Sequence, residues 1–396
     1  MSKVYSLPTR PADDSAGTPG TASVDEILAE LRAGRMVVIL DDEDRENEGD
    51  LIMAAQYATP EAVAFMIRHT SGIICVPMAP EQLARLELPQ MVPNNDEAYR
   101  TAFTVSVDYR FGTTTGVSSS DRAATIRALV DPGSSAQDFA RPGHIFPLRP
   151  RRGGVLIRAG HTEAAMDLCM LAGLQPAGVL CELMNDDGTM ARRAEIEVFA
   201  REHALKIGTI ADLIRYRLRN ERTVERVSEQ TVQTQFGEFH LVAYEDRVQH
   251  GVHLALVRGP LDQKVAPLVR VHVADTLRDL LGIRGDARAW TLRAALERVA
   301  QSGNGIVVIL REPEDPQELT EALRALTPAG APQGAAAPPQ KPPQGAARAV
   351  LRTYGIGAQI LKDLGVRRMR VLSAPKQMHG ISAFDLEVES YLGEET

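Results

Sequence analysis

The sequence predicts an α/β (α+β) protein of two domains. The chain has 396 residues, more than a single hydrophobic core ordinarily serves. From Val24 onward, short apolar runs alternate with amphipathic helical stretches, a pattern typical of sheets covered by helices. A charged segment poor in apolar residues begins at Thr223 and indicates a boundary. We therefore expect a mixed-sheet domain at 24–222 and an α+β domain at 223–396.

The first domain is predicted to alternate strands with helices. Strands are expected where apolar residues run together or alternate with polar ones, at 37–40, 51–55, 73–76, 101–107, 155–157 and 179–183. Helices are expected where apolar residues recur at helical spacing, at 60–69, 120–129, 162–171, 195–203 and 210–219. The segment 131–154 is crowded with Pro, Gly and Arg and is predicted to be a loop.

The second domain is predicted to combine strands and helices. Successive antiparallel strands are expected at 231–242, 253–257 and 268–273, followed by helices at 275–281 and 291–301. A buried strand at 306–310 and a return at 356–364 and 369–372 complete this prediction. The polar tail 1–23 is expected to be mobile. The stretch 327–348, of Ala, Pro, Gly and Gln, carries too few core-forming residues to fold and is expected to be disordered.

The composition is that of a soluble globular protein, with 44% hydrophobic and 24% charged residues. The net charge of -8 argues against a general nucleic-acid binder, which carries a basic patch or stripe. Apolar runs are too short to cross a bilayer and the N-terminus lacks the order of a signal peptide, so we expect a cytoplasmic protein without membrane contact. Cys75, Cys169 and Cys181 include no CxxC pair and imply neither a disulfide framework nor a structural zinc site.

An acidic run, Asp41 to Asp50, directly follows the first predicted strand. Most isolated charge runs are solvated turns. This run carries a single Arg and a Gly and stands at a strand end, where α/β proteins usually bind ligands. Clustered carboxylates also form a hard-oxygen site for Mg²⁺ or Mn²⁺. The run is therefore either a solvated turn or part of a metal site.

A second constellation, Arg158 to Thr162, joins a predicted strand to a helix. The backbone N–H groups at the helix start, with Arg158 and the Thr162 hydroxyl, would form a cradle for a phosphate. On spacing alone, Thr162 is equally well an ordinary N-cap, with His161 at the surface. A third interpretation makes His161 a metal ligand that completes the acidic site.

Three further residues have suitable chemistry. Glu182 ends a predicted strand, where a carboxylate suits proton transfer, although a capping or salt-bridging role fits equally well. His144 is presented by the predicted Pro- and Gly-rich loop, but lone histidines are more often packed or solvated than catalytic. Thr115 belongs to the hydroxyl-rich turn 113–120, which either binds sugar and phosphate oxygens or simply caps a helix.

Six longer segments occur in order across 24–219: DRENEGD, TAFTVSVD, TTTGVSSSDRA, RPGHIFPLR, RAGHTEA and AGVLCELMNDDGTMAR. Together they resemble the 3,4-dihydroxy-2-butanone 4-phosphate synthase family, and several matches in order are far more specific than one motif. The resemblance implies conversion of D-ribulose 5-phosphate to 3,4-dihydroxy-2-butanone 4-phosphate and formate in riboflavin biosynthesis. It also implies metal-assisted enolisation with skeletal rearrangement, in a homodimer whose active site lies at the subunit interface.

The resemblance implies residue roles as well. Glu46 and His161 would hold Mg²⁺ or Mn²⁺, and His144 and Glu182 would be the catalytic groups. Substrate contacts are implied for Arg45, Glu46, Asp50, Thr115, Arg158, Ala159, Gly160, His161, Thr162 and Glu182. Cys75 stands at a position that the family often uses near the substrate, and its alternative role is that of a small buried hydrophobe.

Four segments of the second half resemble GTP cyclohydrolase II, at 236–239, 250–257, 269–272 and 354–361. That enzyme needs three cysteine thiolates to hold zinc, whereas all three cysteines here precede Thr223. We therefore predict a degenerate domain without zinc and without GTP hydrolysis. Two alternatives stay open, a bifunctional enzyme with a zinc-independent cyclohydrolase and a non-catalytic regulatory protein.

Overall fold

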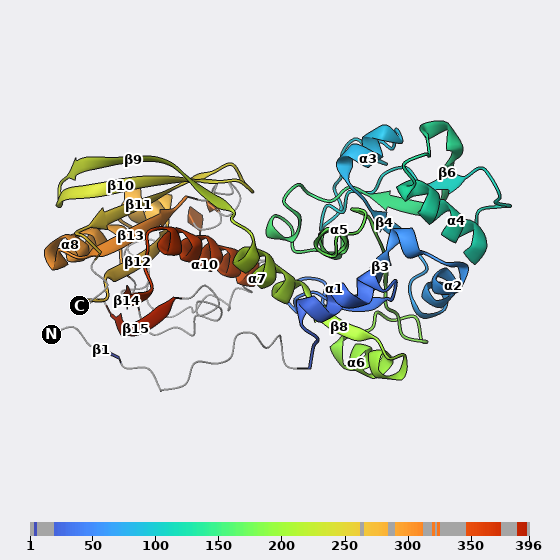
Figure 1. Cartoon of the computed structure of the whole chain (residues 1–396), viewed down its shortest axis with the longest axis horizontal. Coiled ribbons are helices and arrows are strands. Elements are labelled where there is room, and N and C mark those ends of the chain that lie inside the picture. Colours follow the sequence, from blue (N-terminus) through green and yellow to red (C-terminus); the bar gives the residue numbers. More distant parts are fainter. Residues whose placement is uncertain are drawn as a thin grey trace. The chain divides into compact units, whose positions relative to one another are not determined.

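The computed structural model describes residues 4–5, 20–261, 265–283, 290–311, 319–320, 323–324, 346–373 and 386–393. The chain divides into two compact units, each with its own sheet and helices (Figure 1). The N-terminal unit comprises Ala16–Arg217, and the C-terminal unit comprises Leu218–Thr396 together with Met1–Ser15. Because both sheets are mixed and carry helices, the predicted α/β class is confirmed.

The N-terminal unit is built on a sheet with the strand order β5-β6-β4-β7-β3-β2-β8. Its strands are β2 (Val37–Leu40), β3 (Gly49–Ala54), β4 (Cys75–Pro77), β5 (Val107–Tyr109), β6 (Phe139–Leu148), β7 (Gly178–Glu182) and β8 (Lys206–Thr209). Its helices are α1 (Val24–Arg32), α2 (Pro60–His69), α3 (Pro80–Arg85), α4 (Ser119–Val130), α5 (His161–Leu171), α6 (Arg193–Glu202) and α7 (Ile210–Asn220).

The neighbouring strands β2 and β3 explain where the acidic run lies. Every residue of both strands is buried, as expected for apolar runs in the interior of a sheet. They pair antiparallel, with Leu40 opposite Gly49, so the run is the loop that connects them. A Cβ on Gly49 would lie 2.6 Å from Ile196 Cδ1 and 2.9 Å from Leu40 Cδ2, so a larger residue would force these side chains to shift.

Helix α5 brings the second constellation to the same sheet. Its residues from His161 to Cys169 are all buried, including the polar His161, Thr162, Glu163 and Asp167. A Cβ on Gly178 of β7 would lie 2.9 Å from the Ala165 Cβ, so the helix packs closely on that strand. The segment 155–157 was predicted as a strand. It instead forms the end of a short 3₁₀ helix, Gly154–Leu156, and the C-cap of that helix, shortly before α5 begins.

The prediction of a loop at 131–154 was wrong in the central part of this segment, which forms the ten-residue strand β6. Pro and Gly normally weaken a strand. Here they fall in a register shift, since Val107 of β5 pairs with Ile145 whereas Asp108 pairs with Ala140. The residues 141–144 therefore bulge out of the ladder, and a bulge accommodates Pro and Gly and redirects side chains.

Other boundaries in this unit also differ from the prediction. The expected strand 101–107 is regular only at its end, in β5, and its earlier part makes isolated bridges. Strand β8 was not predicted, and it pairs parallel with β2 at the edge of the sheet. Its short sequence, Lys206–Thr209, carries too little periodicity to distinguish it from a loop.

The C-terminal unit contains a sheet with the order β1-β15-β14-β12-β13-β11-β10-β9. Its strands are β1 (Val4–Tyr5), β9 (Val224–Thr234), β10 (Gly237–Asp246), β11 (Val252–Arg258), β12 (Leu268–Val273), β13 (Gly305–Leu310), β14 (Arg368–Leu372) and β15 (Glu387–Leu392). The helices are α8 (Leu292–Ser302), α10 (Ala346–Asp363) and a π-helical turn, Thr276–Leu280.

Several predictions for this unit are corrected. The expected strand 231–242 is a hairpin of β9 and β10, because Gly237 has a φ of 105° and reverses the chain. Strand β12 pairs parallel with β13 and β14, not antiparallel. The predicted disordered stretch 327–348 lies outside the described residues up to 345, and 346–348 begin α10. The predicted tail 1–23 also lies largely outside them.

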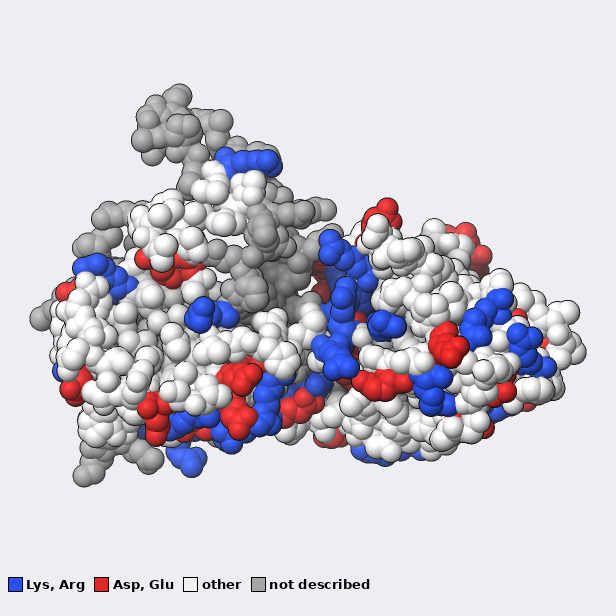
Figure 2. All heavy atoms as spheres, turned by 90° about the horizontal axis from the view of Figure 1, so that it is seen from above, with Lys and Arg blue, Asp and Glu red and all other residues white. Residues whose placement is uncertain are grey.

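Surface charge and helix hydrophobicity are the features relevant to nucleic-acid and membrane binding. On the face that Figure 2 shows, each unit carries both Lys or Arg and Asp or Glu side chains. Among the described residues, the structure has no helix that is long and apolar enough to cross a membrane.

Candidate functional site

Two strands, one helix and one loop bring four titratable side chains together in the N-terminal unit. Glu46 lies in the loop between β2 and β3, Asp50 in β3, His161 at the first position of α5 and Glu182 at the end of β7. Asp50 and Glu182 are paired residues on neighbouring strands. His161 Nδ1 lies 3.6 Å from Asp50 Oδ1 and 3.9 Å from Glu46 Oε2. The predicted meeting of the acidic run with His161 is therefore present in the structure.

The contact of His161 Nε2 with a backbone carbonyl fixes the orientation of the imidazole ring. His161 Nε2 lies 3.0 Å from the carbonyl oxygen of Ile39, in β2. A carbonyl only accepts hydrogen bonds, so Nε2 carries a proton and Nδ1 faces the acidic residues. In the neutral ring the Nδ1 lone pair would then be available to a metal, which is how backbone carbonyls usually orient histidine ligands.

The charges of the cluster are strongly coupled. Burial raises the pKa of Asp50 to about 8, and the nearby Glu182 and Glu46 carboxylates add to this effect while His161 opposes it. Burial acts to lower the pKa of His161, but Asp50 and Glu46 raise it to about 9. Asp50 Oδ1 is buried without a hydrogen-bond partner. Three acidic side chains therefore crowd around one buried imidazole, and a bound cation would stabilise their ionised forms.

The ligand atoms fit a hard divalent cation. Among the described residues, Asp41, Glu46 and His161 each offer one atom, and these atoms lie within 4.8 Å of one another. Carboxylate oxygens with an imidazole suit Mg²⁺ or Mn²⁺. Asp41 was not among the predicted ligands. Its carboxylate accepts hydrogen bonds from the Glu46 and Glu48 amides and from Arg45, so it also shapes the loop.

The start of α5 provides donors for an anion. Gly160 is the N-cap residue and no side chain caps the helix, so the amides of the first turn keep their hydrogens free of helical partners. Ala159 and Thr162 are both buried beside it. A Cβ on Gly160 would lie 2.5 Å from Arg158 Nη1, so a glycine keeps the turn compact.

Arg158 has a different environment from the one expected of a phosphate ligand. Its guanidinium donates to Glu163 Oε2 at 2.7 Å, to Thr101 Oγ1 at 2.9 Å and to the Tyr99 carbonyl at 3.2 Å. Glu163 is 1% exposed, so the pair is buried on its acidic side. Arg158 therefore joins the segment 99–101 to the turn before α5.

Glu182 has one neighbour that the sequence did not indicate. Ser71 Oγ donates to Glu182 Oε2 at 2.6 Å, and the Ser71 amide donates to the Glu182 carbonyl at 2.9 Å. Burial raises the pKa of Cys75 and Cys181 above their usual range, with Glu182 adding to it. The two thiols are therefore protonated at neutral pH and are poor nucleophiles.

His144 lies in the bulge of β6 and is held by Asp108. The imidazole Nδ1 lies 2.7 Å from Asp108 Oδ2, and the His144 amide donates to Asp108 Oδ1 at 2.9 Å. A Cβ on Gly116 would lie 2.0 Å from Asp108 Oδ2, so the turn that carries Thr115 packs on this carboxylate. His144 and Thr115 therefore belong to one corner of the unit, with Thr115 exposed.

The structure thus gathers the predicted residues in two groups. Glu46, Asp50, His161 and Glu182 form one group, and His144 with Thr115 forms the other. Within the described part of the chain, His144 makes no hydrogen bond or ion pair with the first group. Strands β4 and β6 connect them, because Cys75 pairs with Leu180 in β7 and with Phe146 in β6, two residues after His144.

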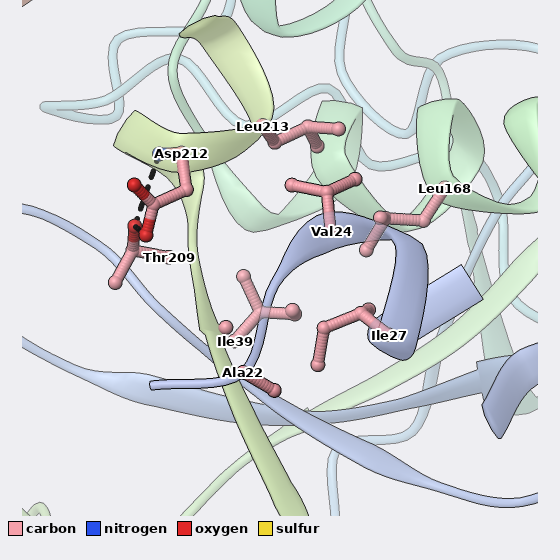
Figure 3. A pocket seen from close by; sticks show the side chains of 9 residues that line it. Ala22, Val24, Ile27, Ile39, Leu168, Thr209, Asp212 and Leu213 are labelled. Carbon is pink, nitrogen blue, oxygen red and sulfur yellow. Dashed lines mark hydrogen bonds between the residues drawn. The ribbon is translucent and has the colours of Figure 1, made fainter. Parts of the chain in front are cut away.

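The N-terminal unit also contains a small pocket (Figure 3). It is lined by Ala22, Val24, Ile27, Ile39, Leu168, Gly208, Thr209, Asp212 and Leu213. Thr209 and Asp212 form a hydrogen bond at one side and cap α7. The pocket contains none of the predicted site residues. Two of its lining residues lie near the site: Ile39, whose carbonyl faces His161, and Leu168, in the helix that begins at His161.

Comparisons with known proteins agree with the two units. Residues 25–216 match the family model of 3,4-dihydroxy-2-butanone 4-phosphate synthase, and residues 225–393 match that of GTP cyclohydrolase II. A 3,4-dihydroxy-2-butanone 4-phosphate synthase of Pseudomonas aeruginosa is 50% identical over 370 residues, which cover 93% of this chain and 98% of the relative. The bifunctional riboflavin biosynthesis protein RIBA 1 of Arabidopsis thaliana is 46% identical, over 94% of this chain and 68% of its own.

A solved structure is similar over nearly the whole chain. RibBX, a two-domain 3,4-dihydroxy-2-butanone 4-phosphate synthase from A. baumannii, is 42% identical with a TM-score of 0.79. The match covers 93% of this chain and 99% of the other. Similarity therefore extends through both units.

Proposed function

The chain belongs to the 3,4-dihydroxy-2-butanone 4-phosphate synthase family, and we propose that it converts D-ribulose 5-phosphate to 3,4-dihydroxy-2-butanone 4-phosphate and formate. The observation that carries this proposal is the approach of Glu46 and His161, with Asp50 and Glu182 beside them. The reaction accumulates negative charge on adjacent substrate oxygens, and this cluster fits a divalent cation that would stabilise such charge.

Each group of the site has a role in this proposal. Glu46 and His161 would hold Mg²⁺ or Mn²⁺, which acts as a Lewis acid when bound. The free amides at the start of α5, with Thr162, would hold the substrate phosphate. Glu182, hydrogen-bonded to Ser71, and His144, hydrogen-bonded to Asp108, would move protons. Arg45, Asp50 and Thr115 are further proposed substrate contacts, although Asp50 is only 2% exposed.

The experiment is an assay of formate release. Purified protein with ribulose 5-phosphate should release formate when Mg²⁺ or Mn²⁺ is present, and should stop when both are chelated. Glu46→Ala and His161→Ala should each abolish release, while Glu81→Ala, an exposed carboxylate of α3, should not. Wild-type protein that gives no formate with either metal would contradict the proposal.

For the residues 223–396 we propose a cyclohydrolase II-like domain that does not hydrolyse GTP. The segments that resemble the cyclohydrolase lie in β10, β11, β12 and α10, so much of that framework is present. The chain has only three cysteines, all within 24–222, the proposed synthase domain. His272 instead binds Asp279 at 2.8 Å, and Asp275 accepts from the Arg278 amide, so both carboxylates stabilise the π-helical turn.

Incubation with GTP tests this second proposal. Wild-type protein should leave GTP intact with Zn²⁺ or Mg²⁺ present, because no thiolate set is available to activate water. Appearance of a diaminopyrimidine product would favour the bifunctional alternative. We further propose that the protein is cytoplasmic and forms a homodimer. Light scattering of the purified protein would test the homodimer.

A further inference from the structure

The backbone of the acidic loop is held by side chains from two other parts of the chain. Three successive carbonyls, those of Arg45, Glu46 and Asn47, all accept side-chain hydrogen bonds. The Tyr99 hydroxyl donates to the Arg45 carbonyl at 3.2 Å. Arg192 Nη1 donates to the Glu46 and Asn47 carbonyls at 2.7 and 2.5 Å. These bonds lie on both sides of the proposed metal ligand.

The loop needs such support because of its conformation. Asn47 has a φ of 54°, in the left-handed region that non-glycine residues rarely adopt. Two amides of the loop, those of Glu46 and Glu48, donate to the Asp41 carboxylate. The carbonyls of Arg45, Glu46 and Asn47 instead accept from Tyr99 and Arg192. A charged donor on two adjacent carbonyls therefore stabilises this reversal.

Each of the two donors is itself anchored. Arg192 is the N-cap residue of α6, and its amide is bonded to Glu195. The Arg45 guanidinium carbon lies 5.1 Å from the centre of the Tyr99 ring. The Tyr99 backbone carbonyl accepts a hydrogen bond from Arg158. The loop is thus connected to α6 on one side and to the turn before α5 on the other.

From these contacts we infer that Arg192 and Tyr99 are positioning residues, which hold Glu46 by its backbone where it can bind the divalent cation together with His161. The inference rests on the proposed metal role of Glu46 and His161. Neither residue touches the ligand atoms, so their effect passes through the loop. Arg192 contributes more than Tyr99, because it is charged and bonds two carbonyls.

Metal binding and hydrogen exchange together test this inference. Arg192→Gln should weaken binding of Mn²⁺, measured by electron paramagnetic resonance, by about tenfold, the lower end of the effect of losing a group that orients a ligand. Tyr99→Phe, which keeps the ring, should weaken it by about fivefold, as expected for one neutral hydrogen bond. Amides at 45–49 should exchange faster in both metal-free variants.

Arg193→Gln is the matched control. Arg193 is the next residue, has similar exposure and pairs with Glu197 on its own helix. It should leave Mn²⁺ affinity and exchange unchanged. Arg192→Lys should restore part of the affinity, because an ammonium can still donate to one carbonyl. A merely structural role would lower thermal stability in Arg192→Gln without this recovery.

The outcomes separate the two proposals. If wild-type protein and Arg193→Gln bind Mn²⁺ and Arg192→Gln binds it equally well, with the same exchange at 45–49, the positioning role is wrong. If wild-type protein does not bind Mn²⁺, the proposed metal site is wrong. Exchange in the metal-free protein then still decides whether Arg192 and Tyr99 hold the loop.

Discussion

Asp108 gives His144 an environment that a lone surface histidine lacks. The carboxylate binds both the imidazole and the backbone amide of His144, so it fixes the position and the orientation of the ring. The side chain of His144 is 44% exposed, which leaves its other nitrogen accessible to a substrate. This arrangement matches a general acid–base group oriented by a carboxylate.

Asp108→Asn should therefore lower kcat for formate release by roughly 100-fold while leaving KM nearly unchanged. The amide keeps the shape of the carboxylate but cannot stabilise a charged imidazole. His144→Gln should cost at least as much, and the double variant should be no worse than His144→Gln alone. Additive losses would show that Asp108 acts independently of His144.

Arg158 combines a predicted phosphate contact with a structural ion pair. Its partner Glu163 is almost fully buried and also accepts from the Arg151 amide. Arg158→Gln would leave this carboxylate without its charge partner, so it should lower the free energy of unfolding by about 3 kcal/mol. Chemical denaturation of the variant measures this loss.

The double variant Arg158→Gln with Glu163→Gln separates the two roles of Arg158. Removing both charges should restore most of the stability, because no unpaired charge stays buried. If stability returns but KM for ribulose 5-phosphate stays high, Arg158 also contacts the substrate. Arg158→Gln with unchanged stability would contradict the importance of the buried pair.

Among the elements, α10 carries a carboxylate that bonds the sheet of the C-terminal unit. Asp363, at the end of α10, accepts from Arg222, Arg226 and the Tyr244 hydroxyl. Burial opposes ionisation, yet Tyr244 and Arg226 hold the pKa of Asp363 below its usual value. An ionised Asp363 therefore helps to hold the end of α10 against β9 and β10.

Asp363→Asn should destabilise the C-terminal unit by about 2 kcal/mol at neutral pH. A carboxylate with a lowered pKa stabilises the folded state above its unfolded pKa, and this contribution disappears as the pH falls through the folded value. The difference between variant and wild type should therefore shrink below about pH 4. Fluorescence of Trp290, the only tryptophan in the sequence, follows this unit alone. A difference that grows in acid would contradict the assignment.

For the whole molecule, the two units should respond differently to metal removal. Chelation of divalent metal should abolish formate release, because the N-terminal unit holds the carboxylate and histidine group. The melting of the C-terminal unit, followed by Trp290, should not change. A domain that folds around zinc unfolds when the metal is removed, but this unit is proposed to hold no zinc. Trp290 is buried and its indole donates to the Leu392 carbonyl, so its emission reports unfolding. A large shift on chelation would show that this unit does bind a structural metal.

The sequence predicted the central elements better than the irregular ones. Strands β2, β3, β7 and β13 were predicted because each carries a continuous apolar run, a pattern typical of a buried strand. The same pattern was misleading at 155–157, where the apolar run belongs to a 3₁₀ helix and its C-cap. The strand β6 was missed because its Pro and Gly argue against a strand, and only the pairing with β5 shows that they fall in a bulge. Local pattern does not include a partner strand.

By itself, the sequence determined the mixed α/β class, the order of the family segments and the absence of cysteines after residue 222. These three properties depend on composition and local sequence pattern, which can be read without knowing which residues come into contact in the fold. Tertiary structure alone decided that the Ile39 carbonyl orients His161, that Asp108 holds His144 and that Arg158 is engaged with Glu163. The first two contacts join residues 122 and 36 positions apart, and such distances close only when strand register and helix packing are fixed.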